Sequence, residues 1–366
     1  MTSASAGKDA SLRDATLFVN VPFCIEVPRY AHGRYLTGDG AAKRKYLEAV
    51  MREVASLGDV LEGKRVVAVR IGGGSPSVVG PDQLGELMRL IRAELPMAHG
   101  AEMALEAIPN TVGVPSLTGW GQGKPSRVEL RVGAIHLRDL DELHPPYRVS
   151  DIQNAVLFLD KFGMNNVSVS LVYGLPGQTE ASWRQTLRKA LDLEPYEVAV
   201  SPVSPADGEG LAQERQRALY EVAAALLGER GLVEYAVGRF ARAAGESAYV
   251  KALASGADAV GVGLGAVSCV DGMAWRNTDD FEVYCAGSDD PEQVVRDAAQ
   301  LDDEARAVLV ARRALCLSEG VEAERVSAAV GELSAWEAEG LIVCEDGRWR
   351  LTSEGRFAWQ WRTWAL

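Results

Sequence analysis

Two segments in the first half of the chain carry residues that could bind a small molecule. Residues 71–77 read Ile-Gly-Gly-Gly-Ser-Pro-Ser directly after an apolar run, and consecutive glycines let backbone N–H groups approach a ligand closely. A tight turn would use the same glycines, and the Gly-Lys-Ser/Thr of a phosphate-binding P-loop does not follow. Glu106 ends the next apolar run, where its carboxylate could bind a ligand amine or ribose hydroxyls, or could form a salt bridge or helix cap. These two segments are the first candidates for a ligand site.

Three further residues could take part in catalysis. His136 and His144 flank the loop after a predicted strand, and a histidine there could act as a general base near neutral pH. Surface and capping histidines fit the same pattern. Cys24 follows the first predicted strand, but a lone thiol without an adjacent base is more often a packing residue than a nucleophile.

Short β-branched runs alternate with amphipathic helical stretches from residue 15 to about residue 205. The predicted strands cover residues 16–21, 66–71, 103–106, 128–132, 167–172 and 197–200. Predicted helices lie between most of them, at 41–57, 81–95, 149–162 and 180–193. This alternation predicts parallel strands with right-handed helical crossovers. Six strands indicate a partial barrel rather than a closed eight-stranded one. Such folds bind ligands at the carboxyl ends of their strands, which is where both candidate segments lie.

The composition is that of an acidic globular protein. The chain has 51 acidic and 38 basic residues, a formal net charge of −13, which argues against nonspecific binding to nucleic acid or to an anionic membrane. No run of about 20 apolar residues is present, so we expect no membrane span. Residues 1–14 lack an apolar core and predict a disordered tail rather than a secretory signal. Five scattered cysteines without a Cys-x-x-Cys pair predict a cytoplasmic protein without a disulfide framework.

Four segments together resemble a known family. They are Val-Asn-Val-Pro-Phe-Cys at 19–24, Gly-Gly-Gly-Ser-Pro-Ser at 72–77, Glu-Ala-Ile-Pro-Asn-Thr at 106–111 and Ser-Leu-Val-Tyr-Gly-Leu-Pro-Gly-Gln-Thr at 170–179. The chain is similar to the radical S-adenosylmethionine superfamily, and within it to the HemN-like group related to oxygen-independent coproporphyrinogen oxidase. The resemblance extends over roughly residues 15–360.

The resemblance implies an α/β fold built on a partial (β/α)6 radical-SAM-type barrel. A C-terminal extension and a small winged-helix-like domain would follow. The implied divisions are a tail at 1–14, the barrel at 15–210, a HemN-like extension at 211–299 and a helical, winged-helix-like domain at 300–366.

The chain departs from this family at the iron–sulfur cluster motif. The family binds a four-iron cluster through three cysteines, of which Cys24 matches the first, while the second and third fall on Pro28 and Ala31. Neither replacement offers a donor atom, and the next cysteine is Cys269. Since such clusters need thiolate ligands, we expect no cluster, no other metal site and no radical cleavage of S-adenosylmethionine.

The resemblance also transfers the cofactor contacts of the family. Gly72, Gly73, Gly74, Ser75 and Glu106 remain, and so does Arg148 if one residue is inserted in the alignment. Phe18, Ile135 and Ser170 replace a Tyr, a Gln and a ribose-binding Asp of the family. The implied pocket is therefore more apolar, which suits a bulky apolar or aromatic substrate.

Three functions are compatible with this pattern. The first is a non-radical methyltransferase or cyclopropane-forming cyclase of natural-product biosynthesis that binds intact S-adenosylmethionine, whose sulfonium needs only proximity to a nucleophile. The second is a noncatalytic protein, either a heme- or cofactor-binding paralogue or a partner of an active relative. The third is a cofactor-independent cyclase or isomerase. Glu106, His136 and His144 are the candidate catalytic residues, and the first function is the favoured prediction.

Overall fold

The computed structural model describes residues 12–27, 29–30, 34–203 and 210–360. Six parallel strands in chain order form a curved sheet, as expected. They are β1 (Arg13–Val21), β2 (Lys64–Gly73), β3 (Met97–Ala107), β4 (Arg127–Gly133), β5 (Val167–Tyr173) and β6 (Glu197–Pro202). The prediction of an α/β fold with a partial parallel barrel is confirmed.

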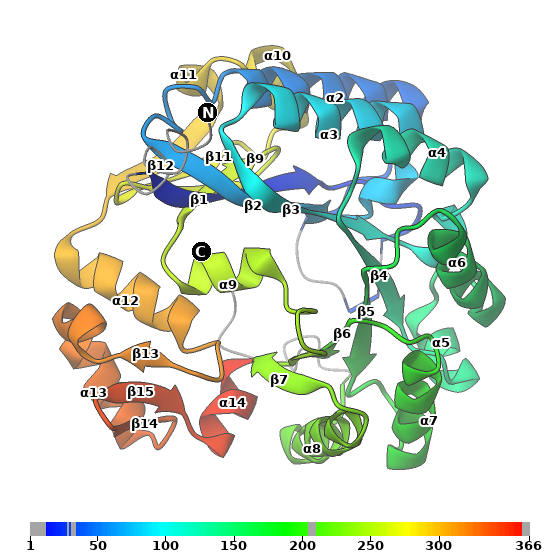
Figure 1. The fold of residues 1–366 in the computed structure, drawn as a ribbon, viewed down its shortest axis with the longest axis vertical. Helices are drawn as coiled ribbons and strands as arrows, with labels where there is room; N and C mark the ends of the chain where they lie inside the picture. The colour runs from blue at the N-terminus through cyan, green and yellow to red at the C-terminus, as the bar shows by residue number, and fades with distance from the viewer. Residues whose placement is uncertain (1–11, 28, 31–33, 204–209, 361–366) are drawn as a thin grey trace, which may run out of the picture.

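Helices cover the convex side of this sheet (Figure 1). They are α2 (Gly40–Ala55), α3 (Pro81–Glu94), α4 (Val114–Gly123), α5 (Leu137–Leu143), α6 (Val149–Lys161), α7 (Glu180–Leu191) and α8 (Gln213–Glu229). The sequence of β4 explains which face of the strand points to the helices, because charged and apolar residues alternate along it. Val128, Leu130 and Val132 are buried in the core beneath the helices, and the intervening charged side chains must face the concave side.

Further strands extend the sheet at both edges. Next to β1 lies β9 (Asp258–Val262), a seventh parallel strand, and beyond it lie three antiparallel ones, β10 (Val267–Val270), β11 (Met273–Asn277) and β12 (Val295–Gln300). Next to β6 lie β8 (Arg239–Ala241) and β7 (Val233–Ala236), both antiparallel to their neighbours. The small helices α10 (Phe281–Gly287) and α11 (Pro291–Val294) pack near α2.

Helix α9 (Ala248–Ala254) lies on the concave side of the sheet (Figure 1). Its N-cap Ser247 accepts from the N–H of Val250, and its closest strand neighbours are β2 and β1. The helix therefore fills part of the space that a closed barrel would enclose.

The C-terminal module has its own core, as the resemblance implied. It contains α12 (Asp303–Ala314), the 3-10 segment at Glu324–Ala329, α13 (Val330–Ala338), α14 (Ser353–Trp359) and a small sheet of β13 (Val321–Glu322), β15 (Arg348–Leu351) and β14 (Ile342–Glu345). Trp336 and Trp359 meet edge to face at 5.1 Å in its core. Trp361 and Trp364 lie outside the described residues.

The N-terminal boundary differs from the prediction. β1 begins at Arg13, inside the segment expected to be a tail, because this arginine pairs with Lys64 in the sheet and with the carboxylate of Asp271. The remaining domain boundaries stay predictions.

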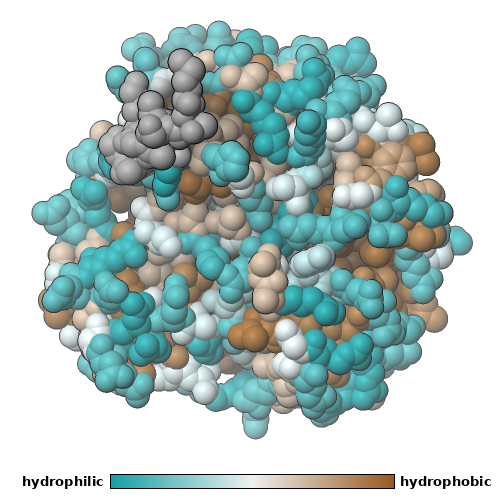
Figure 2. Space-filling view, in the orientation of Figure 1, coloured by the Kyte–Doolittle hydropathy of each residue, from teal (hydrophilic) through white to brown (hydrophobic). Residues whose placement is uncertain are grey.

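The surface mixes charged and apolar residues, and the apolar ones on the face shown in Figure 2 gather on the side of α6 and α7. Among the described residues, no helix is both long and apolar enough to cross a bilayer.

Candidate functional site

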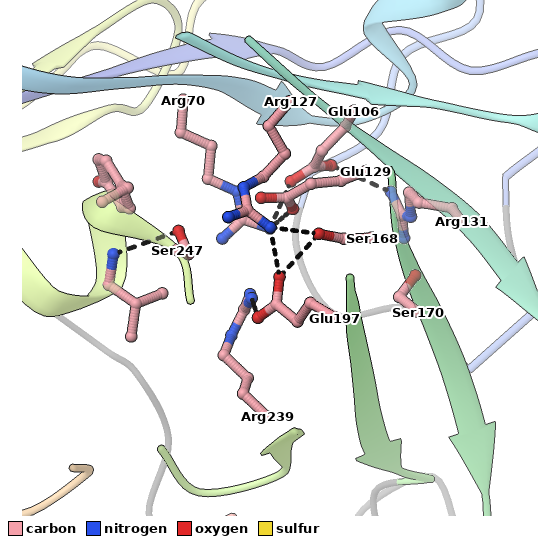
Figure 3. Close-up of polar contacts among 12 residues, drawn as sticks. Arg70, Glu106, Arg127, Glu129, Arg131, Ser168, Ser170, Glu197, Arg239 and Ser247 are labelled. Carbon is pink, nitrogen blue, oxygen red and sulfur yellow. Dashed lines mark hydrogen bonds and ion pairs between the residues drawn. The ribbon is translucent and has the colours of Figure 1, made fainter. Parts of the chain in front are cut away.

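Ion pairs line the concave side of the sheet (Figure 3). They involve four arginines and four glutamates, so the formal charges balance. These residues are Arg70, Arg127, Arg131, Arg239, Glu102, Glu106, Glu129 and Glu197. They fall into two groups. The lower group, near α9, consists of Glu102, Arg127, Glu197 and Arg239. The upper group consists of Arg70, Glu106, Glu129 and Arg131 and lies at the carboxyl ends of the strands, a region that we call the mouth.

The lower group centres on Glu197, whose side chain is fully buried. One carboxylate oxygen accepts from Arg239 at 2.8 Å and from Tyr235 at 2.7 Å, and the other accepts from Arg127 at 3.2 Å and from Ser168 at 2.8 Å. Burial alone would raise the pKa of Glu197, but Arg239 and Arg127 hold it below its ordinary value. Glu197 is therefore held in its ionised form and pairs with two buried guanidinium groups.

Arg127 links this group to α9. Its side chain donates to Glu102 at 2.9 Å and to the carbonyl oxygens of Gly245 and Glu246 at 3.0 and 2.9 Å. Glu102 in turn accepts from the hydroxyl of Ser247, the N-cap of α9, at 3.2 Å. The lower group thus holds the start of α9 against the sheet and is structural.

The upper group contains Glu106. One of its oxygens lies 2.8 Å from Arg70, which also pairs with Glu129 at 2.7 Å, and the other lies 4.0 Å from Arg131. Burial raises the pKa of Glu129, although Arg70 opposes this effect. Glu106, which the sequence analysis predicts to bind a ligand, is therefore already paired with an arginine of the same chain.

The glycine loop packs against the same group. A Cβ on Gly72 would lie 2.4 Å from Oε1 of Glu106, and a Cβ on Gly73 would lie 1.9 Å from Oδ1 of Asn20. Gly73 also has a φ of +98°, which disfavours other residues. A side chain at Gly72 would displace the carboxylate of Glu106, and one at Gly73 would displace the Asn20 amide and strain the backbone as well.

The end of the loop is held by strand β1 and by Arg131. The N–H groups of Gly74 and Ser75 donate to the carbonyl oxygens of Val21 and Phe23, at 2.9 and 2.7 Å. The carbonyl of Gly74 accepts from Arg131 at 2.6 Å. Three polar backbone groups of this loop are thus bonded within the protein.

Two predicted cofactor residues share this surface. Phe18 on β1 is the register neighbour of Arg70, and Ser170 on β5 is the register neighbour of Arg131. Both are half-buried, and Figure 3 shows Ser170 close to Arg131. The structure therefore brings Phe18, Ser170, Glu106 and the glycine loop together.

Ile135 and His136 lie elsewhere. Ile135 lines a groove of about 600 Å³ on the convex side, between α6 and α7, with Val156 and Leu193. The register of β4 against β5 shifts between Arg131 and Gly133, which changes the side to which the following residues point. The N–H of His136 donates to Thr186 on α7 at 3.0 Å, so neither residue joins Glu106.

His144 and Arg148 occupy the loop between α5 and α6. His144 is exposed with a φ of +46°, and its Nδ1 lies 3.2 Å from the carbonyl oxygen of Glu142. Arg148 is exposed at the N-cap of α6. Between them, the hydroxyl of Tyr147 donates to the carbonyl of Arg131 at 2.9 Å, which ties this loop to the mouth.

The segment after Cys24 packs against the same loop. Arg29 lies 2.9 Å from the carboxylate of Glu142, and the hydroxyl of Tyr30 donates to it at 2.7 Å. Ile25 and Val27, on the same segment, are 44% and 61% exposed. The loop that Tyr147 ties to β4 thus carries an exposed imidazole and an exposed guanidinium, and the segment after Cys24 carries two exposed apolar side chains.

Comparisons with known proteins agree on one family of folds. No family model matches the chain. The Escherichia coli coproporphyrinogen III oxidase HemN, described as a radical SAM enzyme, superposes with a TM-score of 0.80 over 97% of this chain and 90% of its own, at 18% identity. The chain has the HemN fold.

The curated relatives that match the chain are heme chaperones. The Mycobacterium tuberculosis heme chaperone HemW is 26% identical over 93% of this chain and 91% of its own length. The Lactococcus lactis heme chaperone HemW is 23% identical over 78% and 79%. The chain is thus similar in sequence to heme chaperones over most of its length.

The chemistry of the donor set does not fit the cluster that this fold family implies. Cys24 is 3% exposed, its thiol lies 3.6 Å from the carbonyl oxygen of Leu36, and burial raises its pKa. Pro28 and Ala31 lie outside the described residues, but by residue type neither is a thiol. Within the described ranges, no three His, Cys, Asp or Glu side chains form a metal-binding group. One protonated thiol cannot replace three thiolates.

The comparisons also correct the predicted function. The favoured prediction, a methyltransferase or cyclase of natural-product biosynthesis, is wrong, because the curated relatives are heme chaperones and the matching fold is that of HemN. The alternative of a heme-binding paralogue agrees better with these findings.

The arginines of the mouth were missed from the sequence. Residues 127–132 read Arg-Val-Glu-Leu-Arg-Val, an alternation that could have indicated a charged concave face. Their partners Arg70 and Glu106 come from other strands, which no local pattern reveals.

Proposed function

We propose that this protein binds heme or a related tetrapyrrole at the mouth of the barrel, without forming an iron–sulfur cluster and without radical chemistry. The heme chaperones among its relatives and the single thiol of the cluster segment support this function. The observation that carries it is the setting of His144.

The contact of His144 with Glu142 supports a role of its ring as a ligand to iron. A carbonyl oxygen can only accept a hydrogen bond, so the contact with Glu142 requires the proton on Nδ1. In the neutral ring the lone pair then lies on Nε2, which is the form that binds a metal. Of the two predicted histidines, His144 is the exposed one, and it lies in the loop that Tyr147 ties to β4. We therefore assign it as the residue that would bind the heme iron.

The surroundings of His144 suit a flat, amphiphilic macrocycle. Ile25 and Val27 offer exposed apolar contacts on a segment that is held at Glu142 by Arg29. Such surfaces bind large aromatic ligands through apolar area, while a few polar groups orient them. Arg148, four residues after His144, remains our candidate for a polar contact to the ligand.

Heme titration followed by absorbance tests this assignment. We expect saturation near one heme per chain and a shifted Soret band. His144→Ala should weaken binding by about tenfold or more and remove the spectrum of the coordinated iron, since a metal–imidazole bond is lost. His99→Ala is the matched control, because His99 is also exposed but lies near the amino-terminal start of β3, away from the mouth. Equal losses in both variants, or none in His144→Ala, would refute the assignment.

Anaerobic iron–sulfur reconstitution tests the second part of the proposal. We expect no charge-transfer band of a cluster and no 5′-deoxyadenosine when S-adenosylmethionine and a reductant are added, since one thiol cannot hold the cluster. Cys24→Ala should leave the bound iron unchanged. Near-stoichiometric cluster iron that Cys24→Ala abolishes would contradict the proposal.

A further inference from the structure

The charge that the mouth offers to a ligand is positive. The side chain of Arg131 is 31% exposed, whereas those of Glu106 and Glu129 are only 10% and 9% exposed. Both glutamates turn toward Arg70, at 2.8 and 2.7 Å. A ligand that enters the mouth therefore meets a guanidinium before it meets a carboxylate.

Arg131 also occupies oxygen atoms with which a cationic ligand would have to pair. Its Nη1 donates to the carbonyl of Gly74 at 2.6 Å and lies 4.0 Å from Glu106. S-adenosylmethionine carries an ammonium, a sulfonium and one carboxylate. Its carboxylate could pair with Arg131 only by bringing the ammonium on the same carbon close to the guanidinium. Unscreened like charges in a partly buried site repel strongly, so this mouth disfavours that cofactor.

We infer that Arg131 makes the mouth an anion site, which prefers a ligand carboxylate without a neighbouring cation and therefore disfavours S-adenosylmethionine, whose carboxylate has an ammonium on the same carbon. A guanidinium has five N–H donors, so Arg131 can hold the Gly74 carbonyl and a carboxylate at the same time. The hydroxyl of Ser170, on the neighbouring strand, is close enough in register to add a further contact. The inference rests on the proposed tetrapyrrole binding and deepens it, because it names the propionate carboxylates as the groups recognised.

Two iron-free probes separate this inference from heme coordination. Protoporphyrin IX has two free carboxylates, its dimethyl ester has none, and neither has iron for His144 to ligate. Binding is followed by quenching of tryptophan fluorescence in the wild type, Arg131→Ser, Arg131→Lys and the control Arg184→Ser. Arg184 lies on α7, on the convex side, in a surface pair with Glu180. S-adenosylmethionine is titrated into the same proteins by calorimetry.

We expect the wild type and Arg184→Ser to bind the free acid about tenfold more tightly than the ester, as a charge-assisted pair allows. Arg131→Ser should lose this preference, and Arg131→Lys should keep most of it, so that a folding defect in the serine variant does not decide the result. S-adenosylmethionine should give no heat with the wild type. Equal binding of acid and ester by the wild type, an unchanged preference in Arg131→Ser, or micromolar binding of S-adenosylmethionine by the wild type would each overturn the inference. Loss of heme coordination in His144→Ala would not affect the inference about Arg131, because the two porphyrin probes contain no iron.

Discussion

Replacing Glu197 with alanine should lower the free energy of unfolding by about 3–5 kcal/mol, the cost of removing one member of a buried ion pair. Without this carboxylate, Arg127 and Arg239 would remain buried with less compensation, and Tyr235 and Ser168 would each lose a hydrogen-bond partner. The turn before α9 should loosen as well, because Arg127 also holds the carbonyls of Gly245 and Glu246. Urea unfolding followed by circular dichroism measures the loss.

Glu180→Ala is the matched control for this prediction. Glu180 also pairs with an arginine, Arg184, but four residues away on α7 and with 59% of its side chain exposed. Such pairs contribute about 0.3–0.5 kcal/mol. A loss below about 1 kcal/mol in Glu197→Ala would show that the lower group does not hold the concave side together.

The second large effect is a dependence of stability on pH that comes from Glu53. This residue of α2 is buried, and burial raises its pKa to about 7, although it accepts from the N–H of Gly263, from Asn277 and from Tyr284. The folded protein then holds a proton that the unfolded chain releases near pH 4.5. Glu53 therefore contributes most to the free energy of unfolding below pH 4.5. As the pH rises from 4.5 to 7, this contribution falls by about 3 kcal/mol in total.

Glu53→Gln tests this effect because an amide does not titrate. The free energy of unfolding of the wild type, relative to that of the variant, should fall between pH 4.5 and pH 7 and stay level above pH 7. Glu48→Gln, on an exposed position of the same helix, should run parallel to the wild type. A constant difference between wild type and Glu53→Gln across this range would show that Glu53 keeps an ordinary pKa.

Elements with a strong local pattern were predicted well. The helices expected at 81–95 and 149–162 occur at Pro81–Glu94 and Val149–Lys161, because their apolar residues recur at helical spacing over three turns or more. β3 is longer than expected, since Met97–Glu102 contains His99 and Gly100 and lacks a strand-like run.

Long-range pairings could not be predicted in the same way. The glycine-rich residues 256–265 contain β9, a strand whose position is set by pairing with β1 about 240 residues earlier. At the site, the sequence located the glycine loop and Glu106 but not Arg70 and Arg131, which decide what Glu106 can bind. Ile135 was assigned to the pocket by alignment, and the register shift before it places it on the convex side.

The position of β1 between β2 and β9 also matters while the chain is being made. The ribosome adds about 5–20 residues per second, so β9 follows β1 after about 12–48 seconds. During that interval one edge of β1 has no partner strand, although it belongs to the middle of the finished sheet. An open strand edge is a template for pairing with other chains. During this period the open edge of β1 must be kept from pairing with strands of other chains. A protein truncated before residue 258 should therefore aggregate rather than form a smaller barrel.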